Sequence, residues 1–339
     1  MTTPVNMRAS ILEHTRSLIV ADVPVPALAT DQVLVRIAAV GVCGSDVHYF
    51  HEGRIGDFVV EEPLILGHEA SGTIVAVGAD VSADRVGERV SIEPQRPCRR
   101  CRFCTAGRYN LCDRIEFYAT PPIHGAFAEY AVIQDDFAHS VPDSISDDAA
   151  ALMEPLSVGI WSCRKAGIAP GTSVLIAGAG PIGIVIAQVA RAFGATDIVV
   201  SDPVAERREL ALRFGATRAI DPINDGIPSA AFDAFIDASG SSIAVKQGIG
   251  SLRGAGIAVL VGMGADDVSL PVSTIQNREL VVTGVFRYAN TWPTAIALVA
   301  SGAVDLDALV TGHFGLDDVE AALESTNSPA TLKSMVVPS

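Results

Sequence analysis

The hydrophobic positions divide the chain near residue 150 into two parts of different character. Before that point, short segments rich in β-branched residues are separated by Gly, Pro and Asp, which predicts strands over 33–40, 72–77, 89–93 and 127–133. Short strands at irregular spacing are typical of an antiparallel, barrel-like domain. The first part of the chain is therefore expected to be β-rich.

After residue 150, apolar strands alternate with helical segments. Ser146 is a candidate N-cap for the first helix. Strands are predicted over 173–177, 197–201, 218–220, 232–237 and 256–261, with helices over 181–193 and about 204–214. Strands that are apolar throughout indicate a parallel sheet with helices on both faces.

Two segments depart from this strand–helix alternation. Residues 222–231 are too few for a helical crossover and contain Pro and Gly, so we expect a loop there. Helices near 292–301 and 316–326 and a strand at about 333–337 end the chain. We expect the segment after 286 to pack back onto the first domain.

Three glycines lie between the first of these strands and its helix. Gly178, Gly180 and Gly183 have the spacing Gly-x-Gly-x-x-Gly of a dinucleotide site. They permit the tight turn, the approach of a pyrophosphate and close helix–strand packing. Asp202 ends the second strand, where a carboxylate accepts the ribose hydroxyls of NAD and repels a 2′-phosphate. Arg207 and Arg208 lie close by and would favour NADP unless they lie on a solvated helix face. Because Asp202 occupies the discriminating position, we predict NAD.

Composition and charge limit the class of protein. The 339 residues are 49% hydrophobic and 19% charged, which is a globular composition long enough for two domains. The net charge of −15 leaves no basic face for nucleic acid. No export signal or membrane-length apolar stretch is apparent, so we expect a cytoplasmic protein. Closely spaced cysteines there are more often metal ligands than disulfides.

Four cysteines form one candidate metal site. Cys98, Cys101, Cys104 and Cys112 follow the pattern Cys-x2-Cys-x2-Cys-x7-Cys. Four thiolates close a tetrahedral shell, so the ion they predict is a structural zinc. The sixth cysteine, Cys163, lies in an apolar helical stretch and is expected to be a buried free thiol.

A second set of donors differs in kind. Cys43, His68 and Glu69 supply a thiolate, an imidazole and a carboxylate and leave the fourth position of a zinc ion open. The charges of the zinc ion, the thiolate and the carboxylate sum to zero. Such a site can lower the pKa of an alcohol bound at the open position. Asp46 is placed to hold the second nitrogen of His68. The set predicts a catalytic zinc.

Three further residues are candidates for proton transfer. Glu154 is an acid in an apolar segment, and it either ligates zinc or accepts a proton through a bound water. We favour the second role, because a further anionic ligand would leave the site negative. Ser45 and His48 are candidates to carry the alcohol proton outward. His48 is equally explained as a surface or packing histidine.

These motifs resemble those of the zinc-dependent medium-chain dehydrogenases, specifically the sorbitol (L-iditol, xylitol) dehydrogenase branch. The resemblance covers nearly the whole chain and is carried by segments 42–49, 53–58, 66–72, 107–111, 119–122, 154–159 and 284–293. Some members of this branch lack the four-cysteine site, whereas this chain keeps it and so is similar to the bacterial and yeast polyol enzymes. The short 222–231 connection is also unusual.

The resemblance implies an α/β chain of two domains that forms a homotetramer. A GroES-like catalytic domain would comprise residues 1–154 and 286–339, and a Rossmann domain residues 155–285. Each subunit would bind two zinc ions, with Glu154 facing the zinc-bound water. Further NAD contacts are implied at Ile182, Arg207, Val261, Gly262, Met263, Val285 and Phe286. Polyol hydroxyls would meet Tyr49, Glu154, Arg287 and Tyr288.

The residues themselves agree with a polyol. Arg287 and Tyr288 follow an apolar strand and are expected to face the cleft between the domains. A pocket of Arg, Tyr, Glu and Ser suits a substrate with many hydroxyls, because each buried polar group needs a partner. Arg287 is alternatively a cofactor contact. The alternatives for the whole protein are a threonine or 2,3-butanediol dehydrogenase and a non-catalytic NAD-binding protein.

Overall fold

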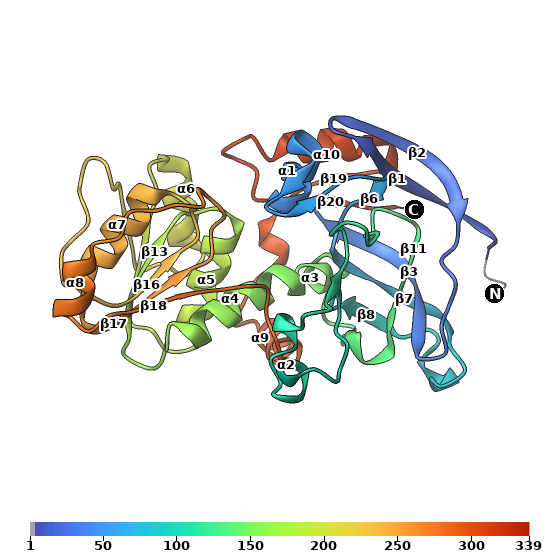
Figure 1. Ribbon diagram of the computed structural model, residues 1–339, viewed down its shortest axis with the longest axis horizontal. Coiled ribbons are helices and arrows are strands. Elements are labelled where there is room, and N and C mark those ends of the chain that lie inside the picture. Colours follow the sequence, from blue (N-terminus) through green and yellow to red (C-terminus); the bar gives the residue numbers. More distant parts are fainter. Residues whose placement is uncertain (1–3, 339) are drawn as a thin grey trace. The chain divides into compact units, whose positions relative to one another are not determined.

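The computed structural model describes residues 4–338 and divides the chain into two compact units. One unit contains the chain up to Glu154 together with the segment from Leu306 onward. The other runs from Pro155 to Asp305. The first is built mainly of strands and the second of alternating strands and helices (Figure 1).

A seven-stranded sheet forms the centre of the first unit. Its strands are β3 (Gln32–Gly41), β7 (Glu69–Val77), β8 (Arg89–Ile92), β11 (Tyr130–Gln134), β12 (Ala138–Ser140), β19 (Val310–Phe314) and β20 (Lys333–Val336). The path runs β12-β8-β7-β3-β20-β19, with β11 also paired to β3. All pairs are antiparallel except β19 with β20. The predicted antiparallel character is confirmed.

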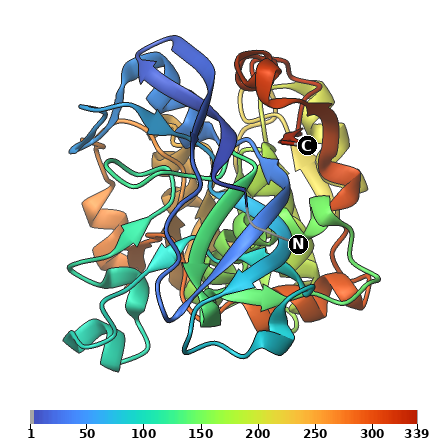
Figure 2. The same cartoon turned by 90° about the vertical axis from the view of Figure 1, so that its right-hand side faces the viewer.

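Smaller elements complete this unit. A second sheet has the order β2-β1-β6, from β1 (Asn6–His14), β2 (Ser17–Pro24) and β6 (Leu64–Ile65). Short strand pairs are β4 (Arg54–Ile55) with β5 (Phe58–Val59) and β9 (Gln95–Arg96) with β10 (Glu116–Phe117). The α-helices are α1 (Gly44–Glu52), α2 (Arg102–Thr105), α3 (Asp147–Ala151) and α10 (Val319–Ser325). Figure 2 shows the strands of this unit in blue, cyan and green. The hydrophobic core of the unit includes Leu12, Ile37, Phe50 and Phe127.

The second unit contains a six-stranded parallel sheet. Its order is β15-β14-β13-β16-β17-β18, from β13 (Ser173–Ala177), β14 (Asp197–Ser201), β15 (Arg218–Ile220), β16 (Phe232–Asp237), β17 (Leu252–Leu260) and β18 (Val281–Gly284). The chain starts at the centre, runs to one edge, and returns to continue toward the other. This order places a topological switch point between β13 and β16, where nucleotides bind in such sheets.

Helices cover both faces of this sheet. They are α4 (Met153–Lys165), α5 (Pro181–Ala192), α6 (Ala205–Arg213), α7 (Ser242–Ser251), α8 (Val272–Asn277) and α9 (Trp292–Ala300). Helices α5 and α6 pack together, as do α7 and α8. Because parallel crossovers are right-handed, the reversal of direction at β13 puts these two pairs on opposite faces. The predicted Rossmann-type sheet is confirmed, and residues 222–231 form turns without a helix.

The C-terminal segment returns to the first unit at Leu306, twenty residues after the position that we expected. Hydrogen bonds explain why residues 290–305 stay with the second unit. Arg164 of α4 donates to the Asn290 carbonyl at 2.9 Å. The side-chain amide of Gln188 in α5 donates to the Asp305 carbonyl at 3.2 Å and accepts from the Asp305 N–H at 2.8 Å. Beyond Leu306, β20 pairs with β3, as the expected packing onto the first domain requires.

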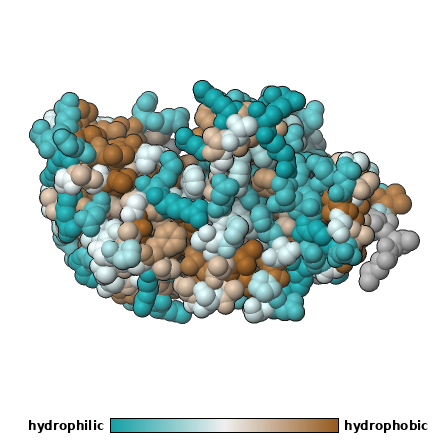
Figure 3. Space-filling view, turned by 90° about the horizontal axis from the view of Figure 1, so that it is seen from below, coloured by the Kyte–Doolittle hydropathy of each residue, from teal (hydrophilic) through white to brown (hydrophobic). Residues whose placement is uncertain are grey.

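No helix within residues 4–338 has the length and apolar character that crossing a bilayer requires. On the face shown in Figure 3, hydrophobic residues occur in patches between hydrophilic ones.

Candidate functional site

Cys43 and His68 are held together by one buried carboxylate. Cys43 is the N-cap of α1, and its backbone N–H donates to Asp46 Oδ2 at 3.0 Å. The other oxygen of Asp46 accepts from the Gly67 N–H at 2.9 Å and lies 3.7 Å from His68 Nδ1. Asp46 is fully buried. It therefore joins the two segments and orients the imidazole, as predicted for the second nitrogen of a zinc ligand.

Gly67 places His68 by its conformation. Its φ is +86°, in the left-handed region that side chains disfavour. A Cβ there would lie 2.6 Å from the ring of Phe127. The turn therefore requires glycine, and it leads directly into β7, where Glu69 is the first residue.

The structure brings Cys43, His68 and Glu69 together as one cluster. Their ligand atoms all lie within 4.8 Å of one another, and His68 and Glu69 are buried. Burial alone would lower the pKa of His68, but Asp46 and Cys43 raise it well above its usual range. The cluster thus favours a cation, and one soft, one borderline and one hard donor suit zinc. Glu154 is buried but is not part of this cluster.

Sequence reasoning missed Lys333, which contacts the same cluster. The ammonium of Lys333 donates to both oxygens of Glu69, at 2.6 Å to Oε2, and to the Val42 carbonyl at 2.9 Å. Burial would lower the pKa of Lys333, but Glu69, Cys43 and Glu154 raise it. A lysine within the apolar strand 332–337 was the available signal, because lysine is seldom buried without a partner.

Ser45, His48 and Tyr49 lie on α1, immediately after Cys43. Ser45 is half-buried and Tyr49 is buried. His48 is exposed and lies 3.4 Å from Glu52, one helical turn on. A histidine at the solvent side of the helix is compatible with both roles considered for it.

The four-cysteine cluster is also assembled. The sulfurs of Cys98, Cys101, Cys104 and Cys112 lie within 4.8 Å of one another. Backbone N–H groups donate to them: Cys98 to Cys112 Sγ at 3.3 Å and Cys104 to Cys101 Sγ at 3.5 Å. All six cysteines of the chain are free of disulfides. Four converging sulfurs with amide donors have the chemistry of a closed zinc site.

The glycine turn of the second unit leaves room for a pyrophosphate. Gly178 has a φ of +96°, and a Cβ on Gly183 would lie 1.9 Å from the Gly178 carbonyl oxygen. Gly180, the N-cap of α5, faces open space, because a Cβ there would meet nothing within 4 Å. The free amides of this helix start therefore point into an accessible space.

Asp202 is fixed beside this turn. Its carboxylate accepts from Ala179 N–H at 2.8 Å and from Val204 N–H at 2.9 Å. Arg208 donates to the Asp202 carbonyl at 2.7 Å and pairs with Asp221 at 3.4 Å. Burial lowers the pKa of Arg207, which Asp202 partly counters. The carboxylate is thus held in place, and Arg208 is already engaged.

A cavity of about 640 Å³ opens at this position within the second unit. Gly178, Gly180 and Asp202, the predicted cofactor contacts, are among the residues that line it. Ile223 and Ile243 also line it and are largely exposed, at 77% and 71%. Sequence reasoning did not identify them. Ile223 lies in the short 222–231 connection, so this loop forms a wall of the cavity.

The remaining predicted contacts lie near the end of β17 and after β18. Val261 and Gly262 are half-buried and Met263 is exposed, whereas Ile182 is the half-buried second residue of α5. The Arg287 guanidinium lies 4.8 Å from the Phe286 ring centre, close to Val285 in the chain. The Tyr288 ring is buried against Trp292 at 5.2 Å. Arg287 has a φ of +52°, so its backbone is strained.

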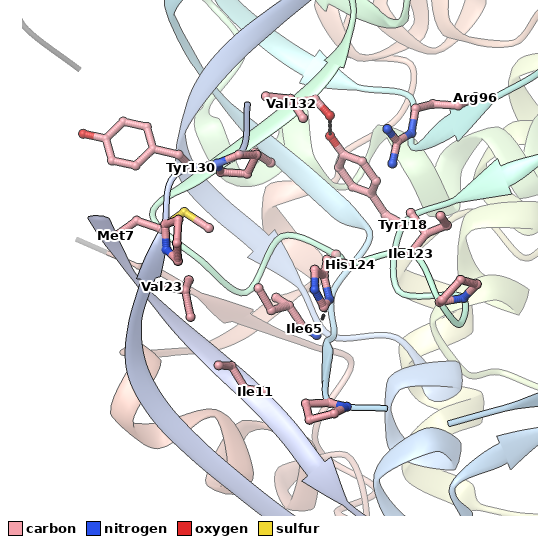
Figure 4. Close-up of a pocket in the computed structure, with 16 residues that line it drawn as sticks. Met7, Ile11, Val23, Ile65, Arg96, Tyr118, Ile123, His124, Tyr130 and Val132 are labelled. Carbon is pink, nitrogen blue, oxygen red and sulfur yellow. Dashed lines mark hydrogen bonds between the residues drawn. The ribbon is translucent and has the colours of Figure 1, made fainter. Parts of the chain in front are cut away.

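A separate cavity lies in the first unit (Figure 4). It measures about 610 Å³ and has mainly apolar walls, including Met7, Ile11 and Val23. His124 accepts a hydrogen bond from the Ile65 N–H, and burial lowers the pKa of its ring. None of the candidate metal ligands lines this cavity.

Comparison with known proteins gives consistent matches. The family described as alcohol dehydrogenase GroES-like domain matches residues 29–143, and zinc-binding dehydrogenase matches residues 181–301. Sorbitol dehydrogenase of Bacillus subtilis (strain 168) is 41% identical over 350 residues, covering 99% of each chain. D-xylulose reductase A of Aspergillus oryzae is 39% identical and covers 96% of this chain and 95% of its own.

A solved structure extends the similarity to three dimensions. It is a candidate zinc-binding dehydrogenase from Sinorhizobium meliloti 1021 with NADP bound. Its identity with this chain is 31% and the TM-score is 0.91, over 98% of this chain and 99% of the other.

Proposed function

Because the chain belongs to the zinc-binding dehydrogenase family, we propose that it oxidises a secondary alcohol of a polyol to a ketone, reversibly, with NAD+ as hydride acceptor. The observation that carries this proposal is the meeting of Cys43, His68 and Glu69, which come from separate segments. A zinc ion held by them would polarise the hydroxyl of the substrate, and NAD+ would take up the hydride.

The residues around the cluster supply positioning and proton transfer. Asp46 fixes the imidazole of His68 through Nδ1, so that Nε2 is left for the ion. Glu154 stands outside the ligand set and, as a buried acid, would hold the water or substrate hydroxyl at the open position. The Ser45 hydroxyl would take the proton of the alcohol and pass it to solvent, where His48 is exposed.

Specificity for NAD rests on Asp202. Its two oxygens are fixed by backbone amides yet retain lone pairs for the ribose hydroxyls. A 2′-phosphate would meet this fixed negative charge. The structural relative was solved with NADP, so the same fold also accepts the phosphorylated cofactor, and the residue at position 202 decides between them. Ile223 and Ile243 would enclose the adenine ring.

The proposed substrate class is a polyol. The relatives with about 40% identity are named for sorbitol and xylulose. Tyr49, Glu154, Arg287 and Tyr288 would offer the polar groups that several hydroxyls require. Arg287 has a strained backbone conformation, with a φ of +52°, and Tyr288 beside it is fully buried.

Initial rates test the proposal. Sorbitol, xylitol, ribitol, threonine and 2,3-butanediol are each assayed with NAD+ and with NADP+, after the zinc content of the protein has been measured. We expect the highest kcat/KM for a polyol with NAD+ and about two zinc ions per subunit. The highest kcat/KM for threonine or butanediol would replace the substrate assignment. A single zinc and no turnover would indicate a non-catalytic NAD-binding protein.

Assembly and location complete the proposal. The resemblance to polyol dehydrogenases supports a homotetramer, which light scattering after gel filtration tests. Six free cysteines, four of them close together, support a reducing compartment such as the cytoplasm. Fractionation of the native cells tests the location.

A further inference from the structure

Lys333 is unusual in its burial. The chain contains only three lysines, Lys165, Lys246 and Lys333. Lys246 is exposed and Lys165 is half-buried, whereas Lys333 retains only 4% of its accessible surface. Burial of an ammonium group is costly unless charge and hydrogen bonds compensate for it. The surroundings of Lys333 provide both.

Three neighbouring strands make this contact possible. Glu69 begins β7, Lys333 begins β20, and β3 lies between them. Gly41 of β3 stands opposite both Glu69 and Met335 in the strand register. A Cβ on Gly41 would lie only 2.0 Å from Glu69 Oε2. The carboxylate thus crosses β3 over a residue without a side chain and reaches Lys333, although 264 residues separate the two in sequence.

All three ammonium protons of Lys333 have acceptors within hydrogen-bonding reach. These are the two oxygens of Glu69 and the carbonyl of Val42, which is the residue before Cys43. Lys333 therefore contacts one proposed zinc ligand directly and the backbone next to another. It compensates for the negative charge that Glu69 and Cys43 bring into a buried site.

We propose that Lys333 is a positioning residue that acts as the internal counter-cation of the Cys43 cluster. It holds the Glu69 carboxylate in place before a metal arrives, and it weakens the binding of the metal afterwards. The proposal rests on the zinc site of the proposed function. Lys333 and the zinc ion would both interact with the negative charge of the Glu69 carboxylate. Each therefore weakens the electrostatic attraction between the carboxylate and the other cation. Linkage makes this effect reciprocal: if zinc weakens the contact of Lys333, Lys333 weakens zinc binding by the same factor.

Because the chain has only three lysines, the response of Lys333 to zinc can be observed directly by NMR. In protein labelled with ¹³C and ¹⁵N at lysine only, three side-chain signals are expected, and the signal missing from Lys333→Arg is that of Lys333. Zinc is then added to wild-type protein that retains the ion of the four-cysteine cluster. The Lys333 signal should shift as the second ion binds, while those of Lys165 and Lys246 stay unchanged. Cys43→Ala, which lacks a complete cluster, should show no shift.

The affinity for the second zinc ion shows whether Lys333 weakens or strengthens zinc binding. It is measured by competition with a chromogenic chelator for wild type, Lys333→Met, Lys333→Arg and the matched control Lys246→Met. Lys333→Met should bind the second ion at least about tenfold more tightly than wild type, within the usual range of couplings between sites. Lys333→Arg keeps the positive charge, so its affinity for the second zinc ion should be closer to that of wild type. Lys246→Met should have the wild-type affinity.

The outcomes separate this inference from the proposed function. If wild type binds only one ion, the zinc site itself fails and the inference with it. If wild type binds two ions but Lys333→Met binds the second equally or more weakly, the inference alone is overturned. A merely structural lysine would lower thermal stability with and without zinc and leave the affinity unchanged. If Lys333→Met does not fold, the wild-type spectra decide, because an unmoved Lys333 signal contradicts the proposal.

Discussion

Replacement of Gly41 by alanine should remove the zinc ion of the Cys43 cluster although none of the proposed ligands is replaced. The new Cβ would lie 2.0 Å from Glu69 Oε2, against about 3.4 Å for an ordinary contact, so the carboxylate must move by about 1.4 Å (3.4 − 2.0). The side chain of Leu152, 3.0 Å from the same Cβ, limits the compensating shift of β3. Metal–ligand distances tolerate only about 0.2 Å. Glu69 in Gly41→Ala should therefore no longer serve as a zinc ligand.

Zinc content and turnover measure this effect. After dialysis against a mild chelator, wild type should retain about two ions per subunit and Gly41→Ala about one, that of the four-cysteine cluster. Disturbing the surroundings of a metal typically costs about 10- to 100-fold in affinity, and displacing a ligand should cost at least that. Gly44→Ala is the matched control, because its Cβ meets nothing within 4 Å. A folded Gly41→Ala with two ions and wild-type turnover would refute the reasoning.

Three further changes test separate parts of the structure. Cys43→Ala should keep the four-cysteine zinc and lose turnover by about 100-fold or more, since Lewis-acid stabilisation is worth several kcal/mol; undiminished NAD+ reduction by this variant would contradict the assignment. Asp202→Ala should raise the KM for NAD+ and lower the ratio of kcat/KM for NAD+ over NADP+, whereas an unchanged ratio would remove Asp202 from cofactor selection. Burial alone would raise the pKa of Asp197, but hydrogen bonds from Arg218 and Ser173 lower it in the folded state. The Asp197 carboxylate therefore stabilises the fold at pH values above its unfolded pKa. This stabilisation is lost as the pH falls through the lower folded pKa. Asp197→Asn should therefore cost up to about 1 kcal/mol in urea unfolding at pH 7, and this cost should shrink as the pH falls through the folded pKa of the carboxylate.

The order of strands and helices in the second unit could be predicted because each signal is local. β13 was expected at 173–177 and runs over Ser173–Ala177, and α5 begins at Pro181 as its fixed φ suggests. Strands that are buried on both faces carry continuous apolar residues, which the hydrophobic pattern records directly. β17 is the exception: it starts at Leu252 instead of 256, because the glycines near its start gave no strand signal.

Contacts between distant segments could not be predicted in the same way. The return of the chain at Leu306 depends on hydrogen bonds from Arg164 and Gln188, which no local pattern records. Ile223 and Ile243 look like ordinary apolar residues, and only the fold places them at the cavity beside Asp202. The residues of both clusters could be recognised as candidate metal ligands from the sequence, because their residue types and spacing restrict the chemistry.

The two metal clusters differ in how they balance their negative charge. The four cysteines have backbone amides as partners: amides of Arg100 and Cys101 lower the pKa of Cys98 to about 6, while burial and the neighbouring thiols raise that of Cys104 to about 12. Metal ligands must be deprotonated, so binding of a metal there would release protons from the thiols. The Cys43 cluster instead contains its own cation in Lys333 and a fixed frame in Asp46. A site whose negative charge is already balanced gains less free energy when it binds a metal ion. A chelator should therefore remove the ion of the Cys43 cluster before that of the four-cysteine cluster.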